Sequence, residues 1–273
     1  MQRPLGISTA MLNTDFEPDL LAAVAARGIT HLELYTPVGS SLFEADEAVL
    51  AVRDVARRHD LVFWSVHAPF GGEVDLSQPD ELPRRHSVQC ILRALEIAER
   101  VDAGMLVIHA GLSTGDEEER RQRLKQAIRS VNELVKRSSQ AGVGLALEYL
   151  PNNKERICNS SQDCNHLLSY VDGAPGICRD TNHANLGEPL AEAVSALSHR
   201  IVALHISDND GVEERHLMPG QGTIDWAEFV RLLDDIGFTG ALIYEASQSS
   251  EDLAERLDMT VSSARQYLGW EPE

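Results

Sequence analysis

Short apolar runs rich in branched residues alternate along the chain with longer amphipathic stretches. Eight of these runs have the length and composition of buried β-strands. They cover residues 5–12, 31–37, 61–70, 104–111, 143–151, 176–185, 201–210 and 240–247. The pattern therefore predicts eight strands, each followed by a stretch long enough for a helix.

The stretches between the runs have the periodicity of helices. The clearest examples are residues 86–101 and 118–140. In the second stretch, apolar residues return at three- and four-residue steps, as they do on one face of a helix. A further helix is expected after Asp225, a typical N-cap residue, and should end just before Gly237.

Strands that alternate with helices form parallel sheets, because each helix carries the chain back to the start of the next strand. The number of units, eight, and the chain length, 273 residues, are those expected of a closed (β/α)8 TIM barrel, an α/β fold. A doubly wound open sheet is the alternative, but no GxGxxG motif follows the first strand. No linker interrupts the pattern, so residues 1–273 are predicted to form one TIM-barrel domain.

The chain is strongly acidic. It carries 24 Lys and Arg against 43 Asp and Glu, which gives a net charge of −19 at pH 7. Such a surface repels phosphate backbones and anionic lipids, so no nucleic-acid or membrane partner is expected. No apolar run is long enough to span a bilayer.

The cysteines and the first residues of the chain bear on its location. Cys90, Cys158, Cys164 and Cys178 form no CxxC pair, and four cysteines are too few for a disulfide framework in a chain of this length. The N-terminal residues lack the apolar core and cleavage site of a signal peptide. Reduced thiols and a cytoplasmic location are therefore expected, with Cys178 as a small buried filler.

Ionisable residues gather where six of the strand-like runs end and in the loop after the seventh run. In a TIM barrel, the C-terminal ends of the strands form the rim of the active site, and the interior below is packed with apolar side chains. The residues at these positions are His67, His109, Glu148, Asp180, His183, His205, Glu214, His216 and Glu245. The rim is therefore the predicted functional site.

Four of the rim residues share their strand face with small or apolar residues. Glu148, Asp180, His205 and Glu245 thus close an apolar interior, where an ionisable group is costly unless it is paired or ligated. Three oxygen donors and one nitrogen suit a single divalent metal ion. We expect Mn²⁺ first, with Zn²⁺, Co²⁺ or Mg²⁺ as alternatives.

Some neighbours of this set have more than one interpretation. His67 and His109 are expected to bind the substrate or to support the ligands, with metal ligation or a structural role as alternatives. Glu33, near the end of the second strand-like run, is expected to anchor a helix or a loop.

Three arginines are available to pair with a rim carboxylate. They are Arg156, Arg179 and Arg215. Because Arg179 is adjacent to Asp180 on a strand, its side chain should face outward, towards a helix.

Together these motifs resemble those of a known family. HAPF, the Glu of ALEYL, RDTNH, HISDND, RHLMPGQGTIDW and the Glu of IYEA follow one another over nearly the whole chain. They are similar to the motifs of the xylose-isomerase-like TIM-barrel superfamily. That superfamily holds sugar (phosphate) isomerases and epimerases, inosose dehydratases and the endonuclease IV branch of abasic-site nucleases. The resemblance implies metal ligation by the four rim residues named above and substrate contacts by His183, Arg215 and His216.

The endonuclease IV branch implies a second assignment. All nine rim residues have a counterpart among the ligands of its three-zinc cluster, although Glu214 stands where that branch has Asp. Two features favour the sugar enzymes. HISDNDG followed by PGQGTIDW is typical of sugar isomerases, and a net charge of −19 leaves no basic surface for DNA.

The resemblance and the donor set both indicate proton transfer at a carbon next to a carbonyl. The substrate would be a sugar or keto-sugar, phosphorylated or not, that reacts through a metal-stabilised cis-enediolate. Glu148 and Glu245 are the predicted bases, one removing the proton and the other returning it, and His183 would orient a hydroxyl. The prediction is therefore a divalent-metal-dependent sugar isomerase or epimerase.

Several alternatives stay open at this stage. They are an inosose-type dehydratase on the same metal site, an endonuclease IV-like zinc phosphodiesterase on abasic DNA, and a barrel that binds a ligand without turnover. Phe16, Phe70 and Tyr149 are expected to form an apolar wall beside the sugar. The identity of the sugar is open, and the composition is compatible with a monomer or a homo-oligomer.

Overall fold

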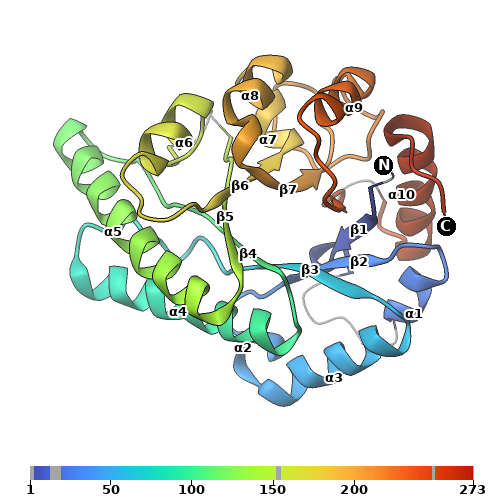
Figure 1. Ribbon diagram of the computed structural model, residues 1–273, viewed down its shortest axis with the longest axis horizontal. Coiled ribbons are helices and arrows are strands. Elements are labelled where there is room, and N and C mark those ends of the chain that lie inside the picture. Colours follow the sequence, from blue (N-terminus) through green and yellow to red (C-terminus); the bar gives the residue numbers. More distant parts are fainter. Residues whose placement is uncertain (1–2, 13–19, 152–154, 248–249, 273) are drawn as a thin grey trace.

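The eight predicted strands are all present and close into a barrel. The computed structural model describes residues 3–12, 20–151, 155–247 and 250–272. Neighbouring strands are parallel, and β1 pairs with β8 to close the ring (Figure 1). The strands are β1 (Leu5–Ser8), β2 (His31–Tyr35), β3 (Val62–His67), β4 (Met105–Ile108), β5 (Gly144–Glu148), β6 (Gly176–Asp180), β7 (Ile201–Ile206) and β8 (Leu242–Tyr244). This confirms the predicted (β/α)8 TIM barrel.

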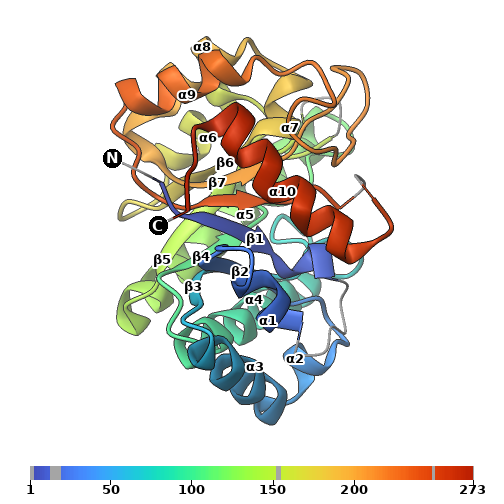
Figure 2. The ribbon, with the colours of Figure 1, turned by 90° about the vertical axis from the view of Figure 1, so that its right-hand side faces the viewer.

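The helices surround the strands, as Figure 2 shows from the side. They are α1 (Leu20–Ala25), α2 (Ser41–Glu44), α3 (Asp46–Arg58), α4 (Glu81–Arg100), α5 (Glu117–Ala141), α6 (Ser161–Leu168), α7 (Thr181–Asn185), α8 (Leu190–Leu197), α9 (Trp226–Asp235) and α10 (Leu253–Leu268). Two further segments, 9–12 and 198–200, form 3-10 turns. The described residues thus hold more helices than the eight expected, because two helices follow β2 and two follow β6.

Local sequence sets where the longer helices begin and end. Helix α5 begins after Asp116, whose side chain accepts a hydrogen bond of 3.0 Å from the backbone N–H of Glu119. The predicted cap of α9 is confirmed, since Asp225 accepts a 2.9 Å bond from the N–H of Glu228. Gly237 follows this helix with a φ of 68°, a left-handed conformation that glycine adopts without steric cost.

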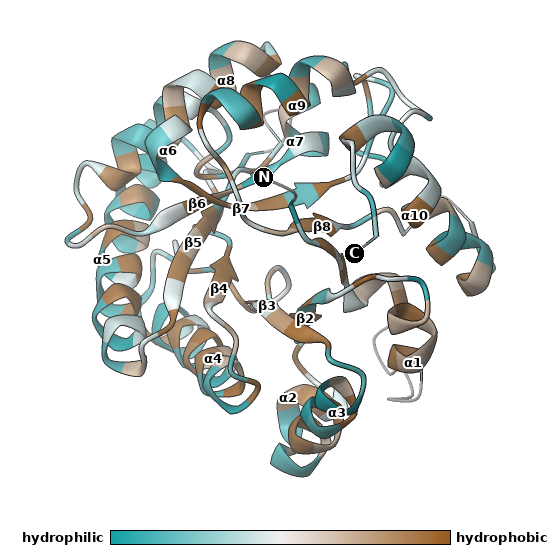
Figure 3. Cartoon of the chain, turned by 45° about the vertical axis from the view of Figure 1, so that its right-hand side comes forward, coloured by the Kyte–Doolittle hydropathy of each residue, from teal (hydrophilic) through white to brown (hydrophobic). Residues whose placement is uncertain are grey.

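Two separate apolar regions stabilise the barrel. The larger one lies between the strands and the helices, and Figure 3 shows the hydrophobic residues concentrated on the strands. The smaller one lies inside the barrel and consists of Val107, Ala146, Cys178 and Ala203. Because the inner layer is apolar, an ionisable residue two positions further along one of these strands lies directly above an apolar interior. Cys178 is the buried filler that the sequence predicts.

A buried aspartate organises the long loop between β7 and α9. Asp208 is 0% exposed, and its Oδ2 accepts hydrogen bonds of 3.0 Å from the N–H of Gly220 and from the indole of Trp226. Its Oδ1 accepts from the N–H groups of Asn209 and Ile224. The HISDND and PGQGTIDW motifs are therefore bound to each other through one carboxylate, which fixes the loop that follows His205.

The structure corrects one expectation about the cysteines. Cys158 and Cys164 form a disulfide, so the expected reduced state is wrong for these two residues. Cys90 and Cys178 are free and buried. No helix in the described part of the chain combines the length and the apolar character needed to cross a membrane. A cytoplasmic location stays a prediction from the sequence.

The Asp208 network gives a stability prediction. Asp208→Ala leaves several buried donors without an acceptor and should lower the free energy of unfolding by about 3 kcal/mol. Asp210→Ala, two residues further on at an exposed position, serves as the matched control and should cost less than about 1 kcal/mol. Urea unfolding followed by circular dichroism measures both; equal losses would contradict the role assigned to Asp208.

Candidate active site

The barrel brings the nine predicted rim residues together at the C-terminal ends of its strands. Seven of them line a cavity of about 250 Å³, and Asp180 and His205 lie buried beneath it. The seven lining residues are His67, His109, Glu148, His183, Glu214, His216 and Glu245. The nine residues that the sequence singles out therefore gather on one face of the barrel.

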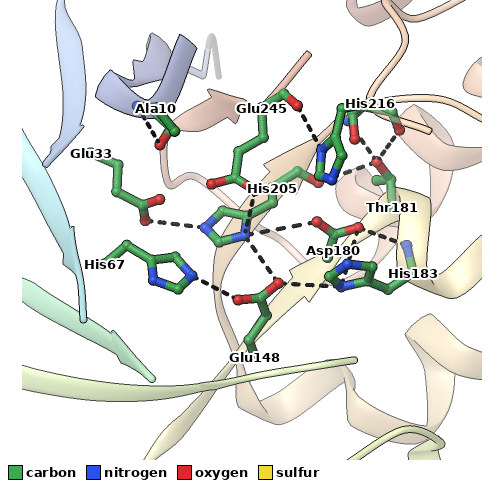
Figure 4. Close-up of polar contacts among 12 residues, drawn as sticks. Ala10, Glu33, His67, Glu148, Asp180, Thr181, His183, His205, His216 and Glu245 are labelled. Atoms are coloured by element: carbon green, nitrogen blue, oxygen red, sulfur yellow. Dashed lines mark hydrogen bonds and ion pairs between the residues drawn. The ribbon is translucent and has the colours of Figure 1, made fainter. Parts of the chain in front are cut away.

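His205 lies at the centre of the predicted ligand set (Figure 4). Its Nδ1 atom is 3.4 Å from Glu245 Oε2, 3.6 Å from Glu148 Oε1 and 3.8 Å from Asp180 Oδ2. The four side chains reach this point from four strand ends, β5 to β8. They thus form a compact set of one nitrogen and three carboxylates.

Glu33 holds the other ring nitrogen of His205, Nε2. The sequence interpretation gave Glu33 a different role. Glu33 Oε2 lies 3.1 Å from His205 Nε2 and also accepts a 2.8 Å bond from the hydroxyl of Ser65. Glu33 is 0% exposed inside the barrel, so the expectation that it anchors a helix or a loop is wrong. Because a carboxylate only accepts, Nε2 carries the proton, and in the neutral ring the lone pair of Nδ1 points at the three carboxylates.

A signal for Glu33 was present in the sequence. In HLELY, Leu32 and Leu34 alternate with Glu33, and both leucines pack in the layer beneath the helices. Alternation therefore places Glu33 on the inner face of β2, on the side of the barrel opposite its helices.

The chemistry of the set fits a divalent cation. Asp180 Oδ2 and His205 Nδ1 are fully buried and have no hydrogen-bond partner among the described residues. Unpaired buried atoms of this kind are rare, because each costs about 1–3 kcal/mol. Oxygen and imidazole donors that converge on one point are suited to Mn²⁺, Zn²⁺, Co²⁺ or Mg²⁺.

The electrostatics of the site favour positive charge at the same point. Burial alone lowers the pKa of His205, but neighbouring groups, among them Cys178, Glu245 and Glu33, outweigh it and hold the pKa well above its usual value. Burial also lowers the pKa of His183, and there too the carboxylates outweigh it, Asp180 foremost. A field that keeps buried imidazoles protonated also stabilises a bound metal cation.

Two histidines hold Glu148 from one side. The Nε2 atoms of His67 and His109 each lie 2.9 Å from the same carboxylate oxygen, Glu148 Oε2. His67 also donates through Nδ1 to the carbonyl of Ala68 at 2.8 Å. Burial lowers the pKa of His67, but the hydrogen bond and charge of Glu148 outweigh it and raise the pKa to about 9. Both histidines therefore fix the direction of the Glu148 carboxylate and also face the cavity.

The two glutamates that were predicted as bases differ in their electrostatics. Burial raises the pKa of Glu148, but the nearby histidines, led by His109, hold it well below its usual value. Burial raises the pKa of Glu245, and the charges of Glu33 and Glu148 add to that shift. A pair of carboxyl groups with pKa values pushed apart is the usual arrangement of an acid and a base.

His183 and His216 face the cavity from the opposite wall. His183 Nδ1 donates to the carbonyl of Tyr149 at 2.9 Å and lies 3.2 Å from Glu148 Oε1. His216 Nδ1 donates to the carbonyl of Glu245 at 2.8 Å. Glu214 lies between the two rings, 3.6 Å from His183 Nε2 and 3.9 Å from His216 Nε2.

The three arginines of the rim region have different surroundings. Arg215 is paired with Asp210 at 3.2 Å on the surface and does not line the cavity. Arg179 faces outward, as predicted, and lies 3.9 Å over the ring of Tyr149. Arg156 lines the cavity.

The expected apolar wall is only partly present. Phe70 lines the cavity and stacks on the ring of His109 with a centroid distance of 4.1 Å. The expectation for Tyr149 is wrong, because its ring packs under Arg179 on the other face of the strand. Phe16 lies outside the described residues. Met11 and Tyr35, which the sequence interpretation did not name, complete the lining on the side of β1 and β2.

A family comparison agrees with this architecture. The family model described as xylose isomerase-like TIM barrel matches residues 21–264. The chain belongs to this family.

Individual relatives carry several names. D-psicose 3-epimerase of Enterocloster bolteae is 26% identical over 230 residues, which cover 81% of this chain and 74% of the relative. Fructoselysine 3-epimerase of Escherichia coli O157:H7 is 31% identical over 170 residues, 59% of each chain. The crystal structure of a D-tagatose 3-epimerase-like protein superposes with a TM-score of 0.84 over 98% of both chains, at 22% identity, which supports the fold. Endonuclease 4-like proteins are also among the relatives.

The Glu33–His205 contact gives a prediction for metal binding. Glu33→Gln keeps the shape of the side chain but removes the charge that orients and polarises His205, so the affinity for Mn²⁺ should fall about 10- to 100-fold. Asp235→Asn, at an exposed position of α9, is the control. Calorimetric titration of the metal-free proteins with Mn²⁺ checks this, and equal affinities of wild type and Glu33→Gln would refute it.

Proposed function

We propose that the protein is a divalent-metal-dependent isomerase or epimerase of a keto-sugar, with epimerisation as the favoured reaction. One observation carries the proposal: Glu148 and Glu245 approach the same point, His205 Nδ1, from different sides, with Asp180 beside them (Figure 4). The 3-epimerase names of relatives in the same family support it. The cavity of about 250 Å³ is of the size of a small molecule.

The resident metal would be held by the residues that surround His205 Nδ1. These are Glu148, Asp180, His205 and Glu245, with Mn²⁺ expected first and Zn²⁺, Co²⁺ or Mg²⁺ as alternatives. When bound, a divalent ion acts as a Lewis acid that makes the proton beside a carbonyl easier to remove. Glu33 would support this site by holding the Nε2–H of His205.

The two glutamates would carry the proton. Glu148 is ionised and held by His67 and His109 through Oε2. Its other oxygen, Oε1, lies 3.2 Å from His183 Nδ1 and 3.6 Å from His205 Nδ1, and would accept the proton from the substrate carbon. Glu245, with its raised pKa, would deliver a proton to the opposite face of the same carbon. Inversion at that carbon is the result; return of the proton to the neighbouring carbon gives the isomerase reaction.

The remaining cavity residues would bind and shield the sugar. His183 and His216 each have Nδ1 occupied by a backbone carbonyl, so their Nε2 atoms face the cavity and can orient hydroxyl groups. Phe70 and Met11 supply apolar surface that excludes water from the reacting carbon. Arg215, paired with Asp210, would reach the substrate only if that ion pair opened.

Replacement of either glutamate should stop proton transfer. Glu148→Gln and Glu245→Gln should each lower the rate of deuterium uptake from heavy water into D-psicose, D-fructose or D-tagatose by at least about 10³-fold, while thermal unfolding stays near that of wild type. NMR follows the exchange on Mn²⁺-loaded protein. Glu192→Gln, exposed on α8, is the control. Undiminished exchange in both variants would eliminate the two-glutamate mechanism, and loss of water without exchange would indicate a dehydratase.

One specific observation favours the endonuclease IV-like alternative: all nine residues that correspond to the zinc ligands of that branch gather around one cavity. The two functions differ in metal content. We expect about one metal ion per chain after purification without chelator, and none in Asp180→Asn. About three zinc ions per chain, together with nicking of an abasic duplex, would replace the sugar-epimerase proposal by a zinc phosphodiesterase on DNA.

A further inference from the structure

A second cavity lies beside the active-site cavity. This side cavity has a volume of about 160 Å³ and lies between the loops that follow β3, β4 and β5. The two cavities share three lining residues, Phe70, His109 and Arg156. Glu148 and Arg156 both line the main cavity, so a substrate bound with its reactive carbon near Glu148 can present a substituent to Arg156.

Arg156 carries the one guanidinium or ammonium group among the described residues that line either cavity. No ion pair or side-chain hydrogen bond joins it to another residue in the described ranges. Other arginines near the rim are neutralised: Arg215 by Asp210 at 3.2 Å and Arg123 by Asp75 at 3.1 Å. In a chain with a net charge of −19, a cavity-lining cation without a carboxylate partner is unusual.

The backbone around Arg156 is held on both sides. Residues 155–157 pair with the loop after β4, since the N–H of Ile157 donates to Gly111 at 3.0 Å and the N–H of Ser113 donates to Glu155 at 2.9 Å. Two residues further on, Cys158 is joined to helix α6 by its disulfide. The backbone that carries Arg156 is therefore fixed beside the two cavities, which both have Arg156 in their lining.

The carboxylates around the two cavities already have partners. In the side cavity, Asp75 accepts hydrogen bonds from Ser77 and from the N–H of Leu112, in addition to its ion pair with Arg123. In the main cavity, Glu148 is held by two histidines, and Glu214 faces His183. The positive charge of Arg156 is therefore available to a ligand.

We infer that the substrate is a keto-sugar with a terminal oxyanion, a phosphate monoester or a carboxylate, and that Arg156 binds this group. The inference rests on the proposed function, because it takes the reactive end of the sugar to lie at Glu148 and Glu245. A guanidinium binds both oxyanions through two parallel N–H···O bonds, which a neutral hydroxyl does not match. Arg156 thus sets the specificity of the site and takes no part in proton transfer.

The test compares anionic and neutral ketoses. D-fructose 6-phosphate, D-fructuronate and D-fructose are titrated by calorimetry into metal-free and Mn²⁺-loaded protein, and deuterium exchange is followed for each. Wild type should bind at least one of the two anionic sugars at least about 10-fold more tightly than D-fructose, and the stronger of the two identifies the oxyanion.

Three variants isolate the guanidinium. Arg156→Gln should weaken binding of the preferred anionic sugar about 10- to 100-fold and leave D-fructose binding and metal content unchanged. Arg156→Lys should recover part of the loss, since it keeps the charge but not the planar fork. Arg120→Gln removes a nearby surface charge that pairs with Glu155 and should behave as wild type.

The outcomes separate this inference from the proposed function. Equal affinity for neutral and anionic sugars, or an anion preference that survives Arg156→Gln, would overturn the assignment of Arg156 even if proton exchange is observed. Arg156-dependent binding of an anionic sugar without any deuterium exchange would uphold the anion site and count against the epimerase.

Discussion

The contact between His205 and Glu33 is the constraint on which the site depends. Both side chains are 0% exposed, and the 3.1 Å bond fixes which ring nitrogen of His205 carries the proton. The other nitrogen, Nδ1, is thereby directed at three carboxylates, which repel one another unless a positive charge, either the protonated imidazole or a bound cation, lies between them. Each strand end around it contributes a group that could hold such a charge, and the apolar layer inside the barrel lies beneath them.

The sequence indicated which residues face the site because inward- and outward-facing side chains alternate along each strand. Glu148 and Asp180 could be assigned to the interior because the small residues before them, such as Ala146 and Cys178, had to face the same way, and both pack inside the barrel. Glu33 was missed because its inner-face companions, His31 and Tyr35, are large and half-buried, so nothing small marked the inner face. A register shift between Leu32 and Glu33 against β3 makes that strand harder still to interpret.

Features that depend on loops escaped prediction for a different reason. The Cys158–Cys164 disulfide joins two cysteines six positions apart at the start of α6, and no spacing rule identifies such a pair in a chain with two other cysteines. The placement of Arg156 beside the cavity depends on its backbone pairing with Leu112, a contact between two loop residues that lie 44 positions apart in the sequence. The loop after β7 was recognised by motif alone, and only the structure shows that Asp208 joins its two ends.

The site divides by origin into two sets of residues with different physical roles. The groups around His205 Nδ1 come from strand ends, and all but Glu245, whose side chain is 15% exposed, are buried. Arg156, Glu214 and Phe70 come from loops and are partly exposed. A barrel keeps its strand ends fixed while its loops vary, so the proposed proton transfer would depend on the first set and the choice of substrate on the second. Under the proposed function, substitutions in the loop set should therefore change which sugar enters the cavity, because the groups assigned to proton transfer lie at the strand ends.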